Sequence, residues 1–320
     1  AFDAHACKVN FSKTSGFIQN FYYMSLVLLL SNDVHCNPGP FFSSLSCYYQ
    51  NARSLNNDFL CDISAMLTDD SGYDVVLFVE SWLNPSVLDG ELCSTGVYNV
   101  FRRDRVVLGK ATGHGGVLAA VKNTVPVQVL PQYTDLEILC LQLFLRDSSV
   151  IYMVLVYLPP PPSVSDVEKL HITICEIQKL MRVGDTLVVI GDFNMSYIEW
   201  KFSEVPGLIP IQSKHSGVND EFLFCVEEAN LKQLLYFPTR NDRFLDLLLV
   251  NEDAVDRVST IHKTDKVIAS DHDAVSFLLH RRDHVQHPSK PISARNIYLW
   301  NKVDTVGFKE ALDKVPFAFI

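Results

Sequence analysis

The stretch TLVVIGDFNMSYIEW, residues 186–200, decides the fold. The four apolar residues before Gly191 have the length and composition of a buried strand. Asp192 and Asn194 follow two positions apart. If the chain stays extended, alternate residues face the same side, so these two polar groups project together while Phe193 turns into the packing. The stretch therefore predicts a core strand that ends in a carboxylate and a carboxamide.

Other apolar runs of the chain also end at a polar residue that can bind a metal ion or a phosphate. These residues are Asn51 after SCYYQ, Glu80 after VVLFV, Tyr157 after MVLV, Asp246 before LLLV, and Asp271 and His272 in SDHDAV. Taken singly, a carboxylate after a strand is usually a turn or cap residue, and a strand-end tyrosine usually packs. The joint pattern indicates that several strand ends build one site.

Short β-rich runs dominate residues 45–280. The runs 136–145 and 150–158, separated by RDSS, predict an antiparallel hairpin. The prolines at 159–162 end the second run, because proline cannot continue the hydrogen-bond ladder. No G-x-G-x-x-G follows a strand, which argues against a dinucleotide-binding fold. We therefore expect the α/β class, as a sandwich with mixed β-sheets.

Helices are expected between these strands. Apolar residues recur at helical spacing as far as Met181, with Ser163 or Ser165 available as the N-cap. A second helix is expected at 219–230 and a third near 58–68. No internal repeat is present.

The composition limits the classes of protein to which the chain can belong. With 320 residues, of which 48% are hydrophobic, the chain can bury a sizeable core in one large domain or two smaller ones. The formal net charge of −10 argues against nucleic-acid binding through a general basic surface. Eight cysteines are scattered singly, without the C-x-x-C pairs of zinc and redox sites, which predicts reduced thiols in an intracellular protein.

The two ends of the chain differ from its middle. The apolar run 21–30 is about half as long as a membrane-spanning helix, so no membrane anchor is expected there. The sequence starts without Met and has no signal-peptide pattern, which suggests a fragment of a longer chain. We expect an N-terminal extension over 1–44, a main domain over 45–281, and a linker over 282–320.

The polar strand ends suit phosphodiester hydrolysis. A hard cation such as Mg²⁺ would offset charge on the phosphoryl oxygens, and it prefers carboxylate and amide oxygens. Glu80 is the first candidate ligand, with Asn51 and Asp271 as helpers. The attacking water needs a base, a role that Asp192 can fill.

The remaining candidates suit the transition state. Asn194, Tyr157 and a protonated His272 can donate to its equatorial oxygens. Asp246 can hold the His272 imidazole in one tautomer and raise its pKa. A serine hydrolase built on Ser270 is rejected, because adjacent residues of an extended chain face opposite sides and no G-x-S-x-G elbow exists.

Eight motifs in order resemble the endonuclease/exonuclease/phosphatase superfamily over about residues 45–280. They are QNARSL, VESWL, FRRDR, GHGGVLAAV, VYLPP, GDFN, FPTR with LDLLLV, and SDHDAV. ESWL, FRRDR and PTR with LDL are similar to the endonuclease domain of LINE-type, non-LTR retrotransposons. The resemblance implies a DNase I-like four-layer α/β sandwich, a divalent metal (Mg²⁺, or Mn²⁺), and DNA nicking that leaves a 3′-hydroxyl to prime reverse transcription.

The resemblance also assigns residues. Eight positions match the family's catalytic set: Asn51, Glu80, Tyr157, Asp192, Asn194, Asp246, Asp271 and His272. Thr239 and Ser270 match supporting positions. His114 departs from the family, which usually has glycine there, but it matches no catalytic position.

The resemblance extends to the segments around the domain. Residues after 280 are similar to the linker that joins such a domain to a reverse transcriptase, and no polymerase motif is present. LVLLLSNDVHCNPGP resembles a ribosome-skipping peptide, with His35 where that pattern carries Glu. We expect a monomeric domain that acts in the nucleus, with a reverse transcriptase of the same polyprotein as partner.

DNA binding should be transient and of low sequence specificity, since no major-groove reading motif is present. The basic candidates for the substrate rim are Arg102, Arg103, Arg105, Lys110, Lys122, Arg240, Arg243, Arg281 and Arg282, of which Arg103 and Arg240 are the main substrate candidates. A phosphatase or phosphodiesterase of the same superfamily, acting on a nucleotide or phospholipid, remains an alternative. A domesticated domain that binds partners without catalysis is another.

Overall fold

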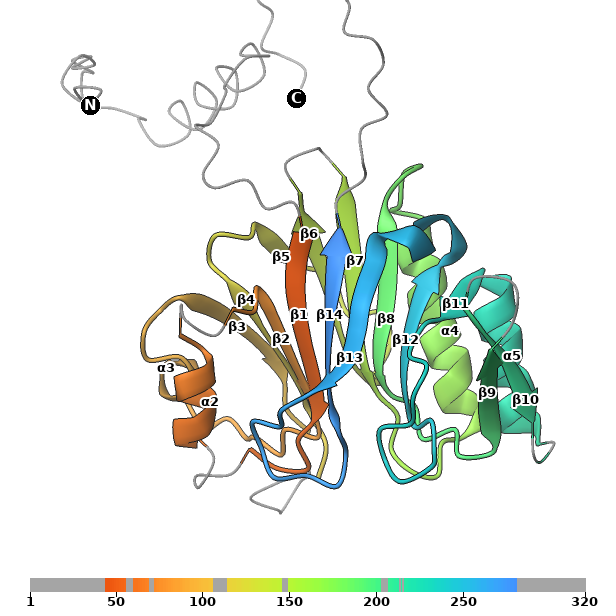
Figure 1. Cartoon of the computed structure of the whole chain (residues 1–320), viewed down its shortest axis with the longest axis horizontal. Helices are drawn as coiled ribbons and strands as arrows, with labels where there is room; N and C mark the ends of the chain where they lie inside the picture. Colours follow the sequence, from red (N-terminus) through yellow and green to blue (C-terminus); the bar gives the residue numbers. More distant parts are fainter. Residues whose placement is uncertain are drawn as a thin grey trace, which may run out of the picture.

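Two β-sheets packed face to face form the centre of the domain (Figure 1). A computed structural model describes residues 44–55, 60–68, 72–105, 114–145, 149–202, 207–212, 214 and 216–280. The expected N-terminal extension, apart from its last residue, and the expected linker lie outside the described residues. So do the apolar run 21–30, the ribosome-skipping motif, and the basic candidates Lys110, Arg281 and Arg282.

The first sheet has six strands in the order β13-β14-β1-β2-β4-β3. Their bounds are β1 Ser44–Asn51, β2 Val75–Val79, β3 Tyr98–Arg103, β4 Val117–Lys122, β13 Val258–Thr264 and β14 Ala274–His280. Strands β1 and β2 are parallel and the other pairs are antiparallel, so the sheet is mixed.

The second sheet has eight strands in the order β5-β6-β7-β8-β12-β11-β10-β9. Their bounds are β5 Val127–Val129, β6 Glu137–Phe144, β7 Val150–Tyr157, β8 Thr186–Asp192, β9 Ile198–Phe202, β10 Leu208–Gln212, β11 Leu231–Gln233 and β12 Asp246–Asn251. The expected hairpin is confirmed as the antiparallel pair β6–β7, while β7 and β8 are parallel.

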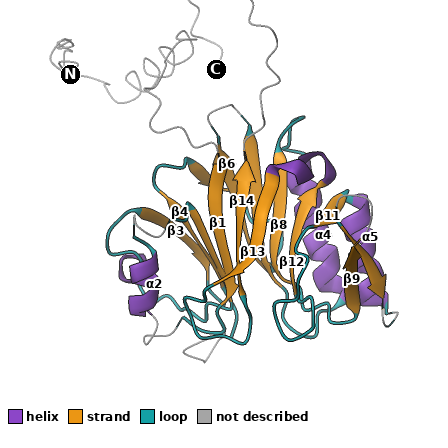
Figure 2. Ribbon diagram, viewed as in Figure 1, coloured by secondary structure: helices purple, strands orange, loops and turns teal. Residues whose placement is uncertain are grey.

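Helices cover the outer face of each sheet (Figure 2). Helices α2 (Leu60–Met66) and α3 (Asp89–Leu92) flank the first sheet, and α4 (Val164–Gln178) and α5 (Gly217–Glu228) flank the second. A 3₁₀ helix, η3 (Glu252–Arg257), links β12 to β13. The layers run helix, sheet, sheet, helix, which confirms the predicted four-layer α/β sandwich. No helix in the described part of the chain is long and apolar enough to span a membrane.

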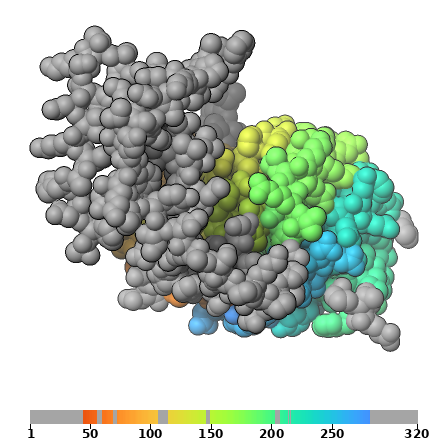
Figure 3. Space-filling model, turned by 90° about the horizontal axis from the view of Figure 1, so that it is seen from above, coloured from red at the N-terminus to blue at the C-terminus, as the bar shows by residue number. Residues whose placement is uncertain are grey.

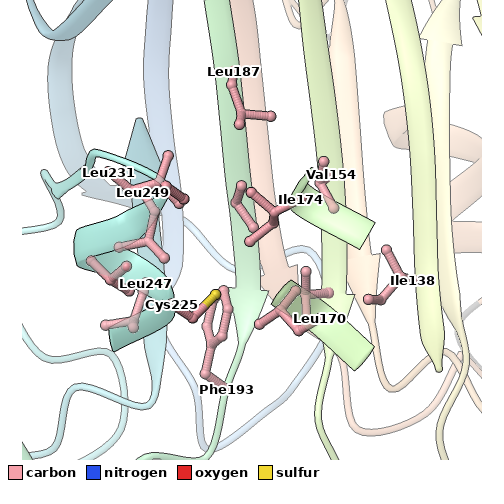
Figure 4. Close-up of a cluster of buried hydrophobic side chains, with 14 of the residues drawn as sticks. Ile138, Val154, Leu170, Ile174, Leu187, Phe193, Cys225, Leu231, Leu247 and Leu249 are labelled. Carbon is pink, nitrogen blue, oxygen red and sulfur yellow. The ribbon is translucent and has the colours of Figure 1, made fainter. Parts of the chain in front are cut away.

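Helix α4 begins where the sequence predicts. The Ser163 hydroxyl accepts a hydrogen bond from the Asp166 amide, and the Asp166 carboxylate accepts one from the Ser163 amide, which together form a capping box. Val167, Leu170 and Ile174 lie on the buried face of the helix. Figure 4 shows Leu170 and Ile174 packed against Val154 of β7 and side chains of β8 and β12. This apolar layer holds α4 and α5 on the second sheet.

Strand β8 lies in the middle of the second sheet, between β7 and β12. All seven of its residues are buried, as the apolar run predicts. Gly191 has a φ of +156°, and a Cβ atom there would lie 1.9 Å from the Val156 carbonyl oxygen. Only glycine therefore permits this close approach of β7 and β8. Phe193, which follows, is fully buried against Phe222 of α5.

The strand ends that carry the polar residues meet at one end of the sandwich. Strand β14 runs upward in Figure 1, so His272, which precedes it, lies at the lower end. Asp246 pairs with Asp192 across β12 and β8, and Tyr157 pairs with Asp192 across β7 and β8. The space-filling view from above (Figure 3) shows the opposite end of the molecule.

Candidate active site

Asn51 connects two carboxylates at the end of β1. Its Nδ2 donates to Glu80 Oε1 and to Asp192 Oδ2, at 2.9 Å in each case. Its Oδ1 accepts from the Arg53 amide at 3.1 Å, and the residue is fully buried. Because a single amide nitrogen serves both acids, the ends of β1, β2 and β8 are fixed against one another.

Asp246 accepts three hydrogen bonds from side chains of distant segments. Tyr49 donates to Oδ1 at 2.5 Å, while the Thr239 hydroxyl donates to Oδ2. His272 Nδ1 lies 2.6 Å from the same Oδ2. A carboxylate with three donors is held in a single orientation, so Asp246 fixes the His272 ring through Nδ1.

The other ring nitrogen of His272 is buried and has no hydrogen-bond partner among the described residues. Burial lowers the pKa of His272, but the charge of Asp246, its hydrogen bond and the charge of Asp192 outweigh this and raise the pKa above its ordinary value. A protonated imidazole would then have one unused N–H donor at Nε2. That donor fits an anionic group such as a phosphoryl oxygen.

Asp192 is buried within hydrogen-bond reach of two other site residues. Besides the Asn51 bond, its Oδ1 accepts from the Asn194 amide at 3.0 Å. Burial, and then the negative charge of Asp246, raise the pKa of Asp192 well above its usual range. A raised pKa suits a carboxylate that must take a proton from water near neutral pH.

Asn194 does not follow the extended path that the sequence suggests. Its φ is +53°, and its Nδ2 donates to the Leu158 carbonyl at 2.8 Å. The chain turns because the Asn194 backbone amide caps the Asp192 carboxylate. The expectation that residues 192 and 194 project side by side from an extended strand is therefore wrong, although Asn194 remains next to Asp192.

Tyr157 ends β7 beside Asp192 and is buried. Burial, followed by the nearby charges of Glu80 and Asp192, raises the pKa of Tyr157, so its hydroxyl keeps its proton. The Arg105 guanidinium lies 5.6 Å from the centre of the Tyr157 ring and also pairs with Glu137. Tyr157 can therefore serve as a neutral donor.

Asp271 lies apart from the buried acids, at the rim. Its Oδ2 pairs with Arg53 Nη1 at 3.0 Å and with Arg240 Nη2 at 2.7 Å. Burial raises its pKa, but Arg240 and Arg53 outweigh this and keep the pKa below its usual range. The Asp271 carboxylate therefore forms ion pairs with two arginines.

Ser270 caps the next turn, since its hydroxyl accepts a hydrogen bond from the His272 amide at 3.2 Å.

No described contact links Arg103 to the buried acids. Its Nη2 donates to the Asp135 carbonyl at 3.0 Å, and the residue lines a separate cavity of about 230 Å³ beside β6. Burial lowers the pKa of Arg103. The neighbouring Arg105, which contacts Tyr157, lies nearer to the site.

The buried acids could hold a metal ion. Donor atoms of Asp192, Asp246 and His272 lie within 4.8 Å of one another. Glu80 and Asp192 share the Asn51 donor, and their remaining carboxylate lone pairs face no other described donor except Trp82 Nε1 and the Asn194 amide. Carboxylate oxygens crowded in this way fit a hard divalent cation, which would offset their mutual repulsion.

Sequence reasoning missed four residues that shape the site. Tyr49 reads as a packing residue in a strand, and nothing nearby signals that its hydroxyl reaches Asp246. Arg53 pairs with Asp271, and the Trp82 amide donates to the Gly115 carbonyl, so both residues depend on segments that are distant in sequence. His114 stacks on Trp82, with ring centres 4.2 Å apart, and Trp82 in turn donates to Glu80.

Comparisons with known proteins agree with this fold. A family model described as endonuclease-reverse transcriptase matches residues 151–276. No curated protein matches the chain in sequence.

Solved structures show the same architecture. The endonuclease domain of TRAS1, a telomere-specific non-LTR retrotransposon, has a TM-score of 0.52 at 17% identity, over 74% of this chain and 98% of that one. The AP endonuclease LMAP from Leishmania major has a TM-score of 0.57 at 14% identity, over 75% and 89%. The catalytic domain of Xenopus laevis APE2 has a TM-score of 0.54 at 13% identity, over 75% and 94%. Over residues 151–276 the chain is therefore similar to the endonuclease-reverse transcriptase family, and its fold is similar to that of the endonuclease domain of a non-LTR retrotransposon and of AP endonucleases.

Proposed function

We propose that the domain is a Mg²⁺-dependent DNA endonuclease that nicks target DNA for a non-LTR retrotransposon. The observation that carries the proposal is the meeting of two hydrogen-bonded groups, Glu80–Asn51–Asp192 and Asp246–His272, whose Asp192, Asp246 and His272 donor atoms lie within 4.8 Å of one another. The similarity to a retrotransposon endonuclease domain supports DNA as the substrate. Chromosomal DNA as target places the action in the nucleus, with a reverse transcriptase of the same polyprotein using the product.

Each residue has a role in one hydrolytic step. The water oxygen attacks phosphorus while Asp192 takes a water proton, the P–O3′ bond breaks, and the 3′ oxygen leaves and is protonated to a hydroxyl. Tyr157 and protonated His272 donate to the phosphoryl oxygens as charge develops there. Asn194 orients Asp192 through its backbone amide. A cation held by Glu80, Asn51 and Asp192 would supply electrostatic stabilisation of the phosphoryl charge.

Plasmid nicking tests the proposal. Supercoiled plasmid is incubated with Mg²⁺ and the parent protein, Asp192→Ala, His272→Ala, or the control His262→Ala, whose exposed ring lies on β13. We expect open-circle product from the parent and the control alone, with ends that a polymerase extends. Equal nicking by every variant would refute the assignment. Release of phosphate from small esters without nicking would favour the phosphatase alternative.

A further inference from the structure

The structure carries a feature beside the metal-binding acids to which the hydrolytic step assigns no role. Trp82 leaves β2 two residues after Glu80, and both residues have a φ of 52°, in the left-handed region. The Trp82 amide donates to the Gly115 carbonyl at 2.8 Å, and the Ser81 amide donates to the Gly116 carbonyl at 3.2 Å. Strained backbone held by such bonds is typical of functional sites. The position of the indole is therefore built into the fold.

The indole is fixed by its neighbours on two sides. Its Nε1 donates to Glu80 Oε2 at 3.3 Å, which places the ring directly beside the catalytic acids. His114 lies over the indole with ring centres 4.2 Å apart and planes 10° apart. A parallel stack of this kind makes a rigid aromatic surface.

A hollow of about 490 Å³ opens next to Trp82. Its described lining is Arg53, Trp82, Ala269, Ser270 and Asp271, and it is not bordered by His114. This volume falls within the roughly 300–1,000 Å³ of ordinary ligand sites. A planar group that enters the hollow meets the indole, which His114 supports from another side.

The lining of the hollow also carries positive charge at Arg53, and Arg240 lies nearby through its pairing with the lining residue Asp271. Arg53 and Arg240 both pair with Asp271 Oδ2, so two cations share one carboxylate. Arg53 keeps 47% of its side chain exposed. One positive charge is thus left over beside an aromatic wall, and this combination suits a nucleotide, with its planar base and anionic phosphate.

We propose that this hollow receives the nucleotide next to the scissile phosphate, with its base against Trp82 and its phosphate near Arg53. The inference rests on the proposed function and deepens it. A base cannot stack on the indole while it remains stacked in a duplex, so DNA with an unpaired nucleotide beside the cut is the favoured substrate.

A base-deletion cycle tests the proposal without cleavage. Fluorescence anisotropy in EDTA and low salt measures binding of a labelled single-stranded oligothymidylate and of an abasic chain of equal length. We expect the parent to prefer the oligothymidylate by about tenfold, since stacking on one aromatic ring contributes about that much per base. Trp82→Leu should remove the preference, and Trp82→Phe, which keeps a ring, should retain most of it.

Matched variants separate the base from the phosphate. Phe224→Leu removes an exposed aromatic ring that packs against His171 on the outer helix layer, and it should keep the full preference. Arg53→Gln should weaken the binding of the oligothymidylate and of the abasic chain by the same factor. His114→Gly should reduce the preference, because the indole loses its support.

The outcomes are distinct from those of plasmid nicking. No base preference in the parent, or a preference that survives in Trp82→Leu, would overturn the nucleotide subsite even if the plasmid is nicked. A Trp82-dependent preference without any nicking would support the subsite and reject the nuclease. Circular dichroism of each variant verifies folding, and Trp82→Phe keeps the test decisive if Trp82→Leu is unstable.

Discussion

A single carboxylate, that of Asp246, raises the pKa and fixes the ring of His272, the proposed catalytic histidine. It receives the Tyr49 and Thr239 hydroxyls and contacts His272 Nδ1, and its charge raises the pKa of His272. The histidine must be protonated to donate from Nε2. Asp246 is therefore a positioning residue that acts through His272, and its removal should appear in the pH dependence of cleavage.

Asp246→Asn should lower the single-turnover nicking rate by about 10²- to 10⁴-fold, the usual worth of an acid–base group. Because the asparagine carries no charge, the pKa of His272 should fall and the basic limb of the pH–rate profile should move to lower pH. Asp253→Asn, at an exposed position of η3, is the control. An unshifted basic limb in Asp246→Asn would contradict the role.

Asp192 makes stability depend on pH. Its pKa is raised in the folded chain, so the folded state keeps a proton that the unfolded chain loses near about pH 3.9. From there up to the raised pKa the folded state binds more protons, and the free energy of unfolding falls as pH rises. Because the pKa of His272 is also raised, the free energy of unfolding falls further as pH rises above about 6.5.

We therefore expect the melting temperature without divalent ions to fall as pH rises from about 4 to 8. Mg²⁺ should restore it most at the upper end, because the cation replaces the lost proton. Asp192→Asn should flatten the fall below about pH 6.5 and reduce the Mg²⁺ effect. Thermal melts at several pH values, with and without Mg²⁺, measure the pH dependence of the melting temperature and the effect of Mg²⁺ on it. A parent curve that rises over this range would rule out the linkage.

At the scale of elements, β8 holds the site in place through its contact with β7. Gly191→Ala would put a Cβ 1.9 Å from the Val156 carbonyl, and backbone cannot give way as a flexible side chain can. We expect a loss of about 1–3 kcal/mol or more in the free energy of unfolding. Gly217→Ala in α5 is the matched control, since its nearest atom would be 3.9 Å away. Urea unfolding compares the two, and equal effects would contradict the close approach.

Long, strongly apolar elements are predictable from sequence, and weak edge elements are not. Strands β1, β2, β6, β7, β8, β12 and β14 and helices α2, α4 and α5 all occur where the pattern puts them. The edge strands β3, β5, β9 and β13, and β10 beside one of them, were missed, because partly exposed strands lack the apolar run that marks a core strand.

Only part of the candidate site can be predicted from the sequence. The pattern of polar residues at strand ends selects Asn51, Glu80 and Asp192, because such residues recur at the ends of several core strands. It cannot find Tyr49 or the turn at Asn194, since a buried hydroxyl and a left-handed residue leave no periodic signal. These depend on the way β12 and β8 bring distant segments together.

At the scale of the whole molecule, the proposed function requires a chain with 37 acidic and 27 basic residues to bind a polyanion. Near the site, four described cations already have acidic partners: Arg53 and Arg240 share Asp271, and Lys263 and Lys266 share Asp273. Such pairing leaves few charges free to displace counterions from DNA. Binding should therefore depend on a small number of phosphate contacts, and on the cation at the site.

This balance predicts a shallow salt dependence. Each neutralised phosphate contributes a slope of about −0.9 to log K against log salt, so we expect a total of about −1 to −3 for duplex DNA in EDTA. Arg240→Gln should reduce its magnitude by about one, because that arginine lies at the rim. Lys179→Gln, which loses only an ion pair with Glu176 at the end of α4, should leave the slope unchanged. Anisotropy of a labelled duplex over a potassium chloride series measures each slope. A parent slope steeper than about −6 would mean that an extended basic surface binds the DNA, and the acidic balance of the chain would then not limit its contact with the substrate.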